Sequence, residues 1–154
     1  MKILGIRCSN KDVTYCVLSG TQTRPKEFAC DTVAFPKGYS LPQSLKWLVQ
    51  EIDGIIEEHG VKAIALKRFE GRTRGKTYEE RVMHEAAIVI AGANRGIKHV
   101  TKKVNSTIAK DLGQKGRAKY LANLDLTLIP SFRGASDKLK DALTVAWSEL
   151  NNGS

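Results

Sequence analysis

The chain has 154 residues, a length that fits one domain; residues 1–150 are assigned to it and residues 151–154 to a polar C-terminal tail. Hydrophobic residues make up 42% and charged residues 27%, which is ordinary for a soluble globular protein, and no apolar run reaches the ~18 residues that cross a bilayer. The composition therefore excludes a membrane-spanning protein, and a cytoplasmic location is expected because residues 1–7 do not resemble a signal peptide.

The net charge of +9 is concentrated in the middle of the chain. Between Lys62 and Lys119 there are 15 Lys and Arg residues and 5 Asp and Glu residues, whereas the rest of the chain holds 10 basic and 11 acidic residues. A localised basic excess is typical of proteins that bind nucleic acids. We therefore expect the phosphate backbone of DNA or RNA as a partner; the alternative is a basic surface without a fixed partner.

The first half of the chain predicts four strands and one helix, in the order strand, strand, strand, helix, strand. A turn at Ser9-Asn10-Lys11 joins the first two strands as a hairpin, and Gly60 is expected to end the helix. A strand that follows a helix after a short loop favours parallel pairing. The expected ranges are 2–8, 12–19, 27–34, 41–59 and 61–67.

The second half of the chain predicts mainly helices. A polar loop that contains glycine comes first, at 71–76, and Ser136 is the expected N-cap of the last helix. The elements between and after them are a helix from Tyr78, a short strand over 97–101, short helices over 104–111 and 114–123, an extended piece over 126–129 and a final helix from Ser136.

The cysteines and histidines do not predict a catalytic or metal site. The cysteines lack zinc-ligand spacing and have no evident base beside them, so we interpret them as reduced, partly buried thiols: Cys8, Cys16 and Cys30. The histidines show no H-x-x-x-H spacing and are interpreted as surface or helix-end residues: His59, His84 and His99.

Three segments carry a resemblance to a known family. Lys2–Cys8 resembles an opening strand that ends in Gly-Ile-Asp, residues 104–115 resemble a glycine-punctuated run rich in Val and Lys, and Lys138–Ala146 resembles an Asp-x-x-Asp-Ala-Leu helix. In this order they are similar to the RuvC-type junction resolvases of the ribonuclease-H-like superfamily. The resemblance covers most of the chain and implies an α/β fold with a mixed five-stranded sheet and flanking helices. Residues 64–75 and 83–88 also resemble a small uncharacterised bacterial family assigned to this fold.

The resemblance also implies a nuclease site, in which several carboxylates hold two magnesium ions that clamp the attacking and leaving oxygens of a phosphodiester. Most of the implied positions carry basic or apolar residues here, and only Asp141 keeps its carboxylate. The departures are Arg7 for the first-strand Asp, Lys138 for the first helix Asp, and Ala65, Leu66 or Lys67, depending on register, for a Glu of the fourth strand.

We interpret this site as catalytically degenerate and without a metal cofactor, since one carboxylate among cations does not hold two magnesium ions. Arg7 and Asp141 are expected to lie close together in a partly exposed groove, with Lys67 or Lys138 nearby. Such cations can neutralise the acid or bind phosphate directly. The alternative is a working magnesium-dependent nuclease rebuilt from relocated acids: Glu70, Glu85 and Asp137.

The loop Gly71–Thr77 resembles a phosphate-binding P-loop but is one residue shorter than that motif, so nucleotide hydrolysis is not expected. Instead, this loop and a later basic segment are expected to contact nucleic-acid phosphates. Phe69 is a candidate for base stacking, whereas Trp47 and Trp147 are expected in the core or an interface. The expected nucleic-acid contacts are Lys67, Arg68, Arg72, Arg74, Lys76, Lys110, Lys115, Arg117 and Lys119.

Three functions stay open from the sequence. The first, which we favour, is non-catalytic binding of a DNA or RNA backbone. The second is magnesium-dependent nuclease activity. The third is a structural or interaction protein, including a homodimer, whose basic face binds an acidic protein. Salt-dependent binding to nucleic acid separates the first from the third, and metal-dependent cleavage identifies the second.

Overall fold

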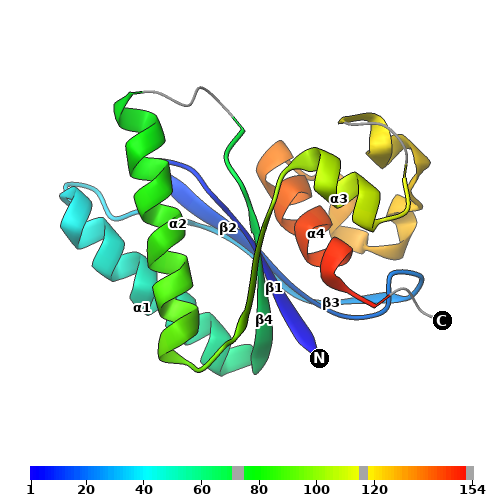
Figure 1. Ribbon diagram of the computed structural model, residues 1–154, viewed down its shortest axis with the longest axis horizontal. Coiled ribbons are helices and arrows are strands. Elements are labelled where there is room, and N and C mark those ends of the chain that lie inside the picture. Colours follow the sequence, from blue (N-terminus) through cyan, green and yellow to red (C-terminus); the bar gives the residue numbers. More distant parts are fainter. Residues whose placement is uncertain (71–74, 115–117, 152–154) are drawn as a thin grey trace.

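A mixed five-stranded sheet forms the centre of the molecule in the computed structural model, which describes residues 1–70, 75–114 and 118–151 (Figure 1). The strand order across the sheet is β3-β2-β1-β4-β5, so that β1 is the middle strand. The expected α/β architecture is confirmed. The strands are β1 (Lys2–Cys8), β2 (Asp12–Gly20), β3 (Pro25–Ala34), β4 (Val61–Lys67) and β5 (His99–Lys103).

Strand direction changes at β1. The pairs β1–β2 and β2–β3 are antiparallel, as the hairpin pattern predicts, whereas β1–β4 and β4–β5 are parallel. Ile6 of β1 lies beside Leu66 of β4, so the next residues, Arg7 and Lys67, both stand at the carboxyl ends of neighbouring strands. In open α/β sheets this is the edge at which ligands bind.

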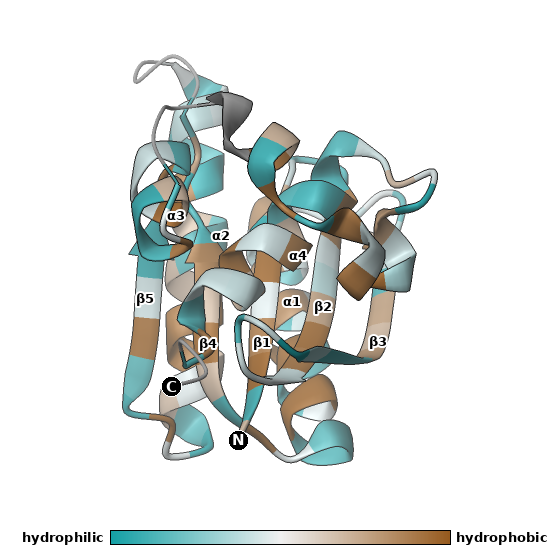
Figure 2. Cartoon of the chain, turned by 90° about the vertical axis from the view of Figure 1, so that its right-hand side faces the viewer, coloured by the Kyte–Doolittle hydropathy of each residue, from teal (hydrophilic) through white to brown (hydrophobic). Residues whose placement is uncertain are grey.

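Helices cover both faces of the sheet (Figure 1). α1 and α2 pack on each other over one face, and α3 and α4 lie on the other. Side chains alternate along β1 between two cores: Leu4 and Ile6 pack with α1 and α2, whereas Ile3 packs with α4. Figure 2 shows the hydrophobic segments of the strands. The helices are α1 (Leu41–His59), α2 (Lys76–Asn94), α3 (Asn105–Asp111) and α4 (Asp137–Glu149).

The ends of two helices follow the signals in the sequence. Ser40 forms a capping box with Gln43 at the start of α1, and Gly60 ends that helix with a φ of 65°, which glycine adopts without steric cost. At the start of α4, the Ser136 hydroxyl accepts from the Leu139 N–H, as expected of an N-cap. The position of α4 along the chain is thus set locally, before any packing.

The seam between α4 and β1 leaves no room for a side chain at Gly5. A Cβ at this position would stand 2.2 Å from the Ala142 carbonyl oxygen and 2.6 Å from Ala146 Cβ, far inside van der Waals contact. This close approach fixes the point along β1 at which α4 crosses the strand. It therefore also fixes the position of Asp141 over the end of that strand.

One expected element is wrong. Residues 126–129 are not extended: Leu126–Leu128 forms a short 3-10 helix, because the Asp125 carboxylate accepts from the Thr127 N–H and starts a turn. Of the helix expected over 114–123, the structure describes a 3-10 helix at Ala118–Asn123. A third 3-10 helix follows at Pro130–Phe132.

Several boundaries also differ from the predictions; β3, for example, begins at Pro25 rather than at residue 27. α2 begins at Lys76 rather than at Tyr78. β5 begins at His99 rather than at residue 97, because the Ile97 N–H still bonds to the Gly92 carbonyl at the end of α2. Among the described segments, no helix combines the length and the apolar character that a membrane span requires.

The interpretation of His84 as a surface or helix-end residue is wrong. This side chain is only 2% exposed and packs against Phe35, with ring centroids 5.0 Å apart, because it lies on the inward face of α2. The cysteines agree with expectation: all three are free thiols, with Cys8 and Cys16 buried and Cys30 half-buried.

Candidate functional site

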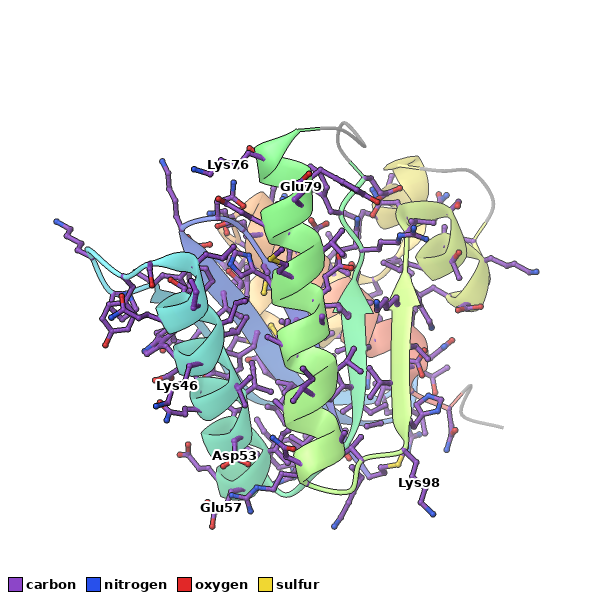
Figure 3. All side chains as sticks on the ribbon, turned by 60° about the vertical axis from the view of Figure 1, so that its left-hand side comes forward. Lys46, Asp53, Glu57, Lys76, Glu79 and Lys98 are labelled. Atoms are coloured by element: carbon purple, nitrogen blue, oxygen red, sulfur yellow. The ribbon has the colours of Figure 1, made fainter. Side chains whose placement is uncertain are left out.

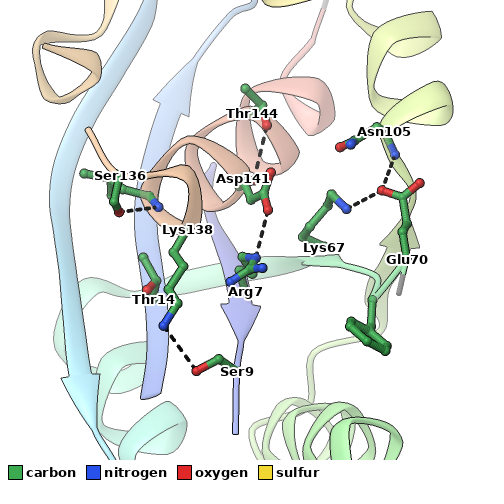
Figure 4. Close-up of polar contacts among 12 residues, drawn as sticks. Arg7, Ser9, Thr14, Lys67, Glu70, Asn105, Ser136, Lys138, Asp141 and Thr144 are labelled. Atoms are coloured by element: carbon green, nitrogen blue, oxygen red, sulfur yellow. Dashed lines mark hydrogen bonds and ion pairs between the residues drawn. The ribbon is translucent and has the colours of Figure 1, made fainter. Parts of the chain in front are cut away.

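Three ion pairs lie at the carboxyl ends of β1 and β4, beside the first turns of α4 (Figure 4). Arg7 faces α4 because side chains alternate along a strand and Gly5, two residues earlier, packs on that helix. Lys67 is the last residue of β4, and Lys138 stands in the first turn of α4. The fold thus brings together three cations from distant parts of the sequence.

Arg7 pairs with Asp141, as the sequence analysis expects. Arg7 Nε lies 2.8 Å from Asp141 Oδ2, and the two side chains are 23% and 26% exposed. Burial raises the pKa of Asp141 above its ordinary value, although the positive charges of Lys67 and Arg7 oppose this effect. Arg7 Nη1 is buried and has no hydrogen-bond partner among the described residues. Part of the guanidinium is therefore not used by the pair.

Lys67 pairs with Glu70. The Lys67 ammonium lies 2.5 Å from Glu70 Oε2 and donates to the Arg68 carbonyl at 3.1 Å. The same Glu70 oxygen accepts from the main-chain N–H of Asn105 at 3.2 Å, which joins the end of β4 to the start of α3. Of the three residues that the sequence leaves open for the fourth-strand position, Ala65 and Leu66 are buried in the two cores, and Lys67 is the one that bonds within this site (Figure 4).

Lys138 pairs with Asp12, the first residue of β2. Its ammonium lies 2.9 and 2.8 Å from the two Asp12 carboxylate oxygens, and Ser9 Oγ donates to the same carboxylate at 2.7 Å. Burial alone would raise the pKa of Asp12, but the hydrogen bonds from Lys138 and Ser9 outweigh it and lower the pKa. Asp12 is not among the site residues expected from the sequence; the one signal for it is its place directly after the hairpin turn.

These residues do not fit a pair of magnesium ions, which would need several carboxylate oxygens turned toward one point. Each acid at the strand ends is bonded to a cation instead. The acids of the nuclease alternative do not converge: Glu70 bonds to Lys67, Glu85 accepts from the Phe69 N–H at 3.3 Å, and Asp137 begins α4. Across residues 1–70, 75–114 and 118–151, no group of three or more His, Cys, Asp or Glu side chains is placed to hold a metal.

The expected nucleic-acid contacts are spread over several elements. Lys67 belongs to the ionic site, Arg68 is exposed just after β4, and the Lys76 side chain is 90% exposed at the start of α2. Lys110 is exposed on α3, where it lines a pocket of about 450 Å³. Four other expected contacts lie outside the described residues: Arg72, Arg74, Lys115 and Arg117. For Lys119 the backbone is described but the side chain is not.

Phe69 and Trp47 are half-buried and contact other side chains, whereas Trp147 is buried. The Arg81 guanidinium lies 4.4 Å from the centroid of the Phe69 ring, and the Tyr78 ring lies 6.4 Å from it, so Phe69 does not present two free faces for base stacking. Trp47 packs on a phenylalanine of the α1–α2 core. Trp147 is 2% exposed and donates to the Gln22 carbonyl at 2.9 Å. The expectation that both tryptophans serve packing is confirmed.

Comparison with solved structures finds this fold in RuvC proteins. Thermus thermophilus RuvC matches with a TM-score of 0.76 at 13% identity, over 96% of this chain and 92% of that one. The same protein in complex with a Holliday junction substrate gives 0.75 at 13% identity, over 96% and 91%. The yeast mitochondrial Holliday junction resolvase gives 0.66 at 14% identity, over 95% and 76%. No protein-family model matches the chain, and no curated protein matches its sequence. The fold is therefore the ribonuclease-H-like fold of RuvC.

Proposed function

We propose that this chain is a RuvC-like domain that binds the phosphate backbone of a nucleic acid without cleaving it. The observation that carries the proposal is a set of three cations at positions where the family resemblance implies carboxylates. Arg7 and Lys67 stand at strand ends, and Lys138 stands in the first turn of α4. The likeness to RuvC, which has been solved on a Holliday junction, supports a nucleic acid as the ligand. The localised basic excess in the sequence supports the same class of ligand.

Binding of this kind positions a backbone rather than reading bases. Lysine and arginine side chains contact phosphates and release counterions, and such contacts carry no base information. We therefore expect little sequence preference. We also expect an affinity that falls steeply with salt, by about 0.9 in the slope of log affinity against log salt for each phosphate neutralised on duplex DNA.

The absence of cleavage is tested directly. Pure protein incubated with branched, duplex and single-stranded substrates in Mg²⁺ or Mn²⁺ is expected to leave all of them intact, because the acids that would hold the metal are replaced or paired. The control is Asp141→Asn, which removes the family acid that the chain retains. Metal-dependent cleavage that disappears in this variant would establish the nuclease alternative.

Backbone binding is tested by a salt titration. The protein should bind labelled duplex with a negative salt slope, and changing Arg72, Arg74 and Lys76 together to Ala should flatten that slope by up to ~3. Affinity should fall by the same factor on unrelated sequences. If the wild-type protein shows no salt-sensitive binding, an acidic protein becomes the leading partner.

A homodimer is part of the proposal, because α2 carries an exposed apolar stripe. Charged residues lie near the two ends of α2 rather than at its middle: Figure 3 shows Lys76 and Glu79 at one end of the helix and Lys98 beyond the other. Exposed apolar patches mark interaction sites, and a patch of one helix is self-complementary when two copies pack about a two-fold axis. The stripe consists of Val82, Met83, Ala86, Ile90 and Ala93.

A further inference from the structure

One carboxylate of the ionic site occupies a position built to hold an anionic oxygen. Glu70 Oε2 receives two donors, the Lys67 ammonium at 2.5 Å and the Asn105 main-chain N–H at 3.2 Å. These donors come from two elements, the end of β4 and the start of α3, and they point at one oxygen (Figure 4). A phosphate oxygen accepts the same charge-assisted hydrogen bonds as a carboxylate oxygen.

We infer that the position held by the Glu70 carboxylate is a phosphate-binding position, and that Glu70 competes with the phosphodiester of a bound nucleic acid for Lys67. The inference rests on the proposed function and adds to it a regulatory contact within the same site. In the free protein Glu70 fills the position. In the complex a phosphate oxygen replaces it and accepts from Lys67 and from the Asn105 N–H.

Lys67 needs an anion more than the other cations of the site do. Its side chain is 6% exposed, compared with 23% for Arg7 and 36% for Lys138. A buried ammonium without an anionic partner is strongly destabilising, so an anion should be present both before and after binding. Exchange of one anion for another satisfies this requirement, whereas simple opening of the pair would leave Lys67 dependent on Asp141, which is already bonded to Arg7.

Glu70 is also the acid that can leave most easily. Its side chain is 38% exposed, against 18% for Asp12 and 26% for Asp141. It lies beyond the end of β4, outside any helix or strand, whereas Asp12 belongs to β2 and Asp141 to α4. Glu70 can therefore turn outward by side-chain rotation alone, without moving an element of the fold.

The test is a comparison of two variants that remove one negative charge each. Glu70→Gln weakens the internal competitor, while Glu79→Gln changes an exposed acid in the first turn of α2 that forms no ion pair with Lys67 among the described residues. Fluorescence anisotropy with labelled duplex DNA and labelled single-stranded RNA over a range of NaCl concentrations gives affinity and salt slope. Circular dichroism and thermal melting check that each variant is folded.

We expect Glu70→Gln to bind several-fold more tightly than both wild type and Glu79→Gln, and to gain up to ~0.9 in salt slope on duplex through one added phosphate contact. Adding Lys67→Met to Glu70→Gln should cancel the gain. If Glu70→Gln fails to fold, Glu70→Asp takes its place, because shortening the side chain by one methylene should weaken its bonds to both donors, and the same order is expected.

Two results overturn the inference in different ways. If wild type binds with a negative salt slope but Glu70→Gln binds no more tightly than Glu79→Gln, Glu70 does not compete and the proposed function stands. If no protein in the series shows salt-sensitive binding to either probe, the proposed function fails and the inference fails with it.

Discussion

The three cations of the site are neutralised in environments of very different exposure. Lys138 and Asp12 form a partly exposed pair, in which water competes for the charges and reduces the contribution to stability. Lys67 is almost fully buried, so removing its partner would leave a desolvated charge. The consequence for mutagenesis is that equal charge changes at Glu70 and Asp12 are not equivalent: the first affects a buried cation and the second a partly hydrated one.

His84 gives a pH dependence that can be measured. Burial, the largest effect, lowers the pKa of His84 below its ordinary value of 6.5; the charge of Glu80 raises it, while that of Arg81 lowers it further. The unfolded chain therefore binds more protons than the native protein just below pH 6.5, so the free energy of unfolding should decrease as pH falls through this range, by at most ~1.4 kcal/mol per pH unit. His84→Phe, which keeps an aromatic ring against Phe35, should flatten this dependence.

Urea unfolding of wild type and His84→Phe between about pH 5 and pH 8 provides the measurement. The difference between the two free energies of unfolding should be constant at high pH, where the imidazole is neutral in both states, and should change as pH falls. An unchanged pH dependence in the variant would mean that His84 takes up its proton without penalty, in spite of its burial.

The packing of α4 on β1 can be tested by adding a methyl group at Gly5, with Gly54 in α1 as the control position. Gly5→Ala would place a methyl group 2.2 Å from the Ala142 carbonyl oxygen, so α4 must move away from β1. We expect a loss of about 2–3 kcal/mol in the free energy of unfolding. Gly54 is exposed in α1, and beyond its chain neighbours and the surrounding helical backbone nothing lies within 4 Å of the place that a methyl group would take, so Gly54→Ala should instead gain ~0.5–1 kcal/mol.

Chemical denaturation compares the two variants directly. Because α4 carries Asp141, Gly5→Ala should also disturb the pair with Arg7, visible as a change in the Asp141 carboxyl resonance. Gly54→Ala should leave that resonance in place. Equal stability of the two variants would show that the seam between α4 and β1 tolerates an added methyl group.

Element by element, periodic segments can be predicted from the sequence, whereas features that depend on a single hydrogen bond are missed. The helical period from Leu41 and the alternation in β1 give α1 and the hairpin correctly. The pattern predicts an extended piece at 126–129, but one hydrogen bond to the Asp125 carboxylate turns the chain into a 3-10 helix. The start of β5 shifts for a similar reason, since one main-chain bond from Ile97 prolongs the end of α2.

For the whole molecule, self-association should depend on the apolar stripe of α2. Ile90 is 54% exposed near the middle of this stripe, and Ile90→Lys should shift the protein toward monomer because a charge in a self-packed patch faces its own copy. Leu128→Lys is the matched control, since Leu128 is 38% exposed away from α2. Sedimentation equilibrium gives the masses; a wild-type monomer at all concentrations would contradict the homodimer.

Only some of the ion pairs in the candidate site could be predicted from the sequence. The pairing of Arg7 with Asp141 could be expected, because the family resemblance places the end of the first strand beside the last helix. The ion-pair partners of Lys67 and Lys138 could not be predicted in this way. Glu70 lies beyond the end of its strand and Asp12 at the start of another, where side-chain direction follows from packing in three dimensions and no periodicity predicts it.

The contact between β1 and α4 also bears on how the protein is made. β1 is synthesised well before α4, so the sheet face that carries Ile3 and Gly5 lacks the cover of α4 until the nascent chain has been extended through residue 149. Domains fold as units during synthesis, and contacts between distant segments form slowly. Arg7 therefore has no Asp141 beside it until α4 has been made. The assembled ionic site is a product of completed translation of the domain, and unfinished chains are exposed along this face to aggregation and to chaperones.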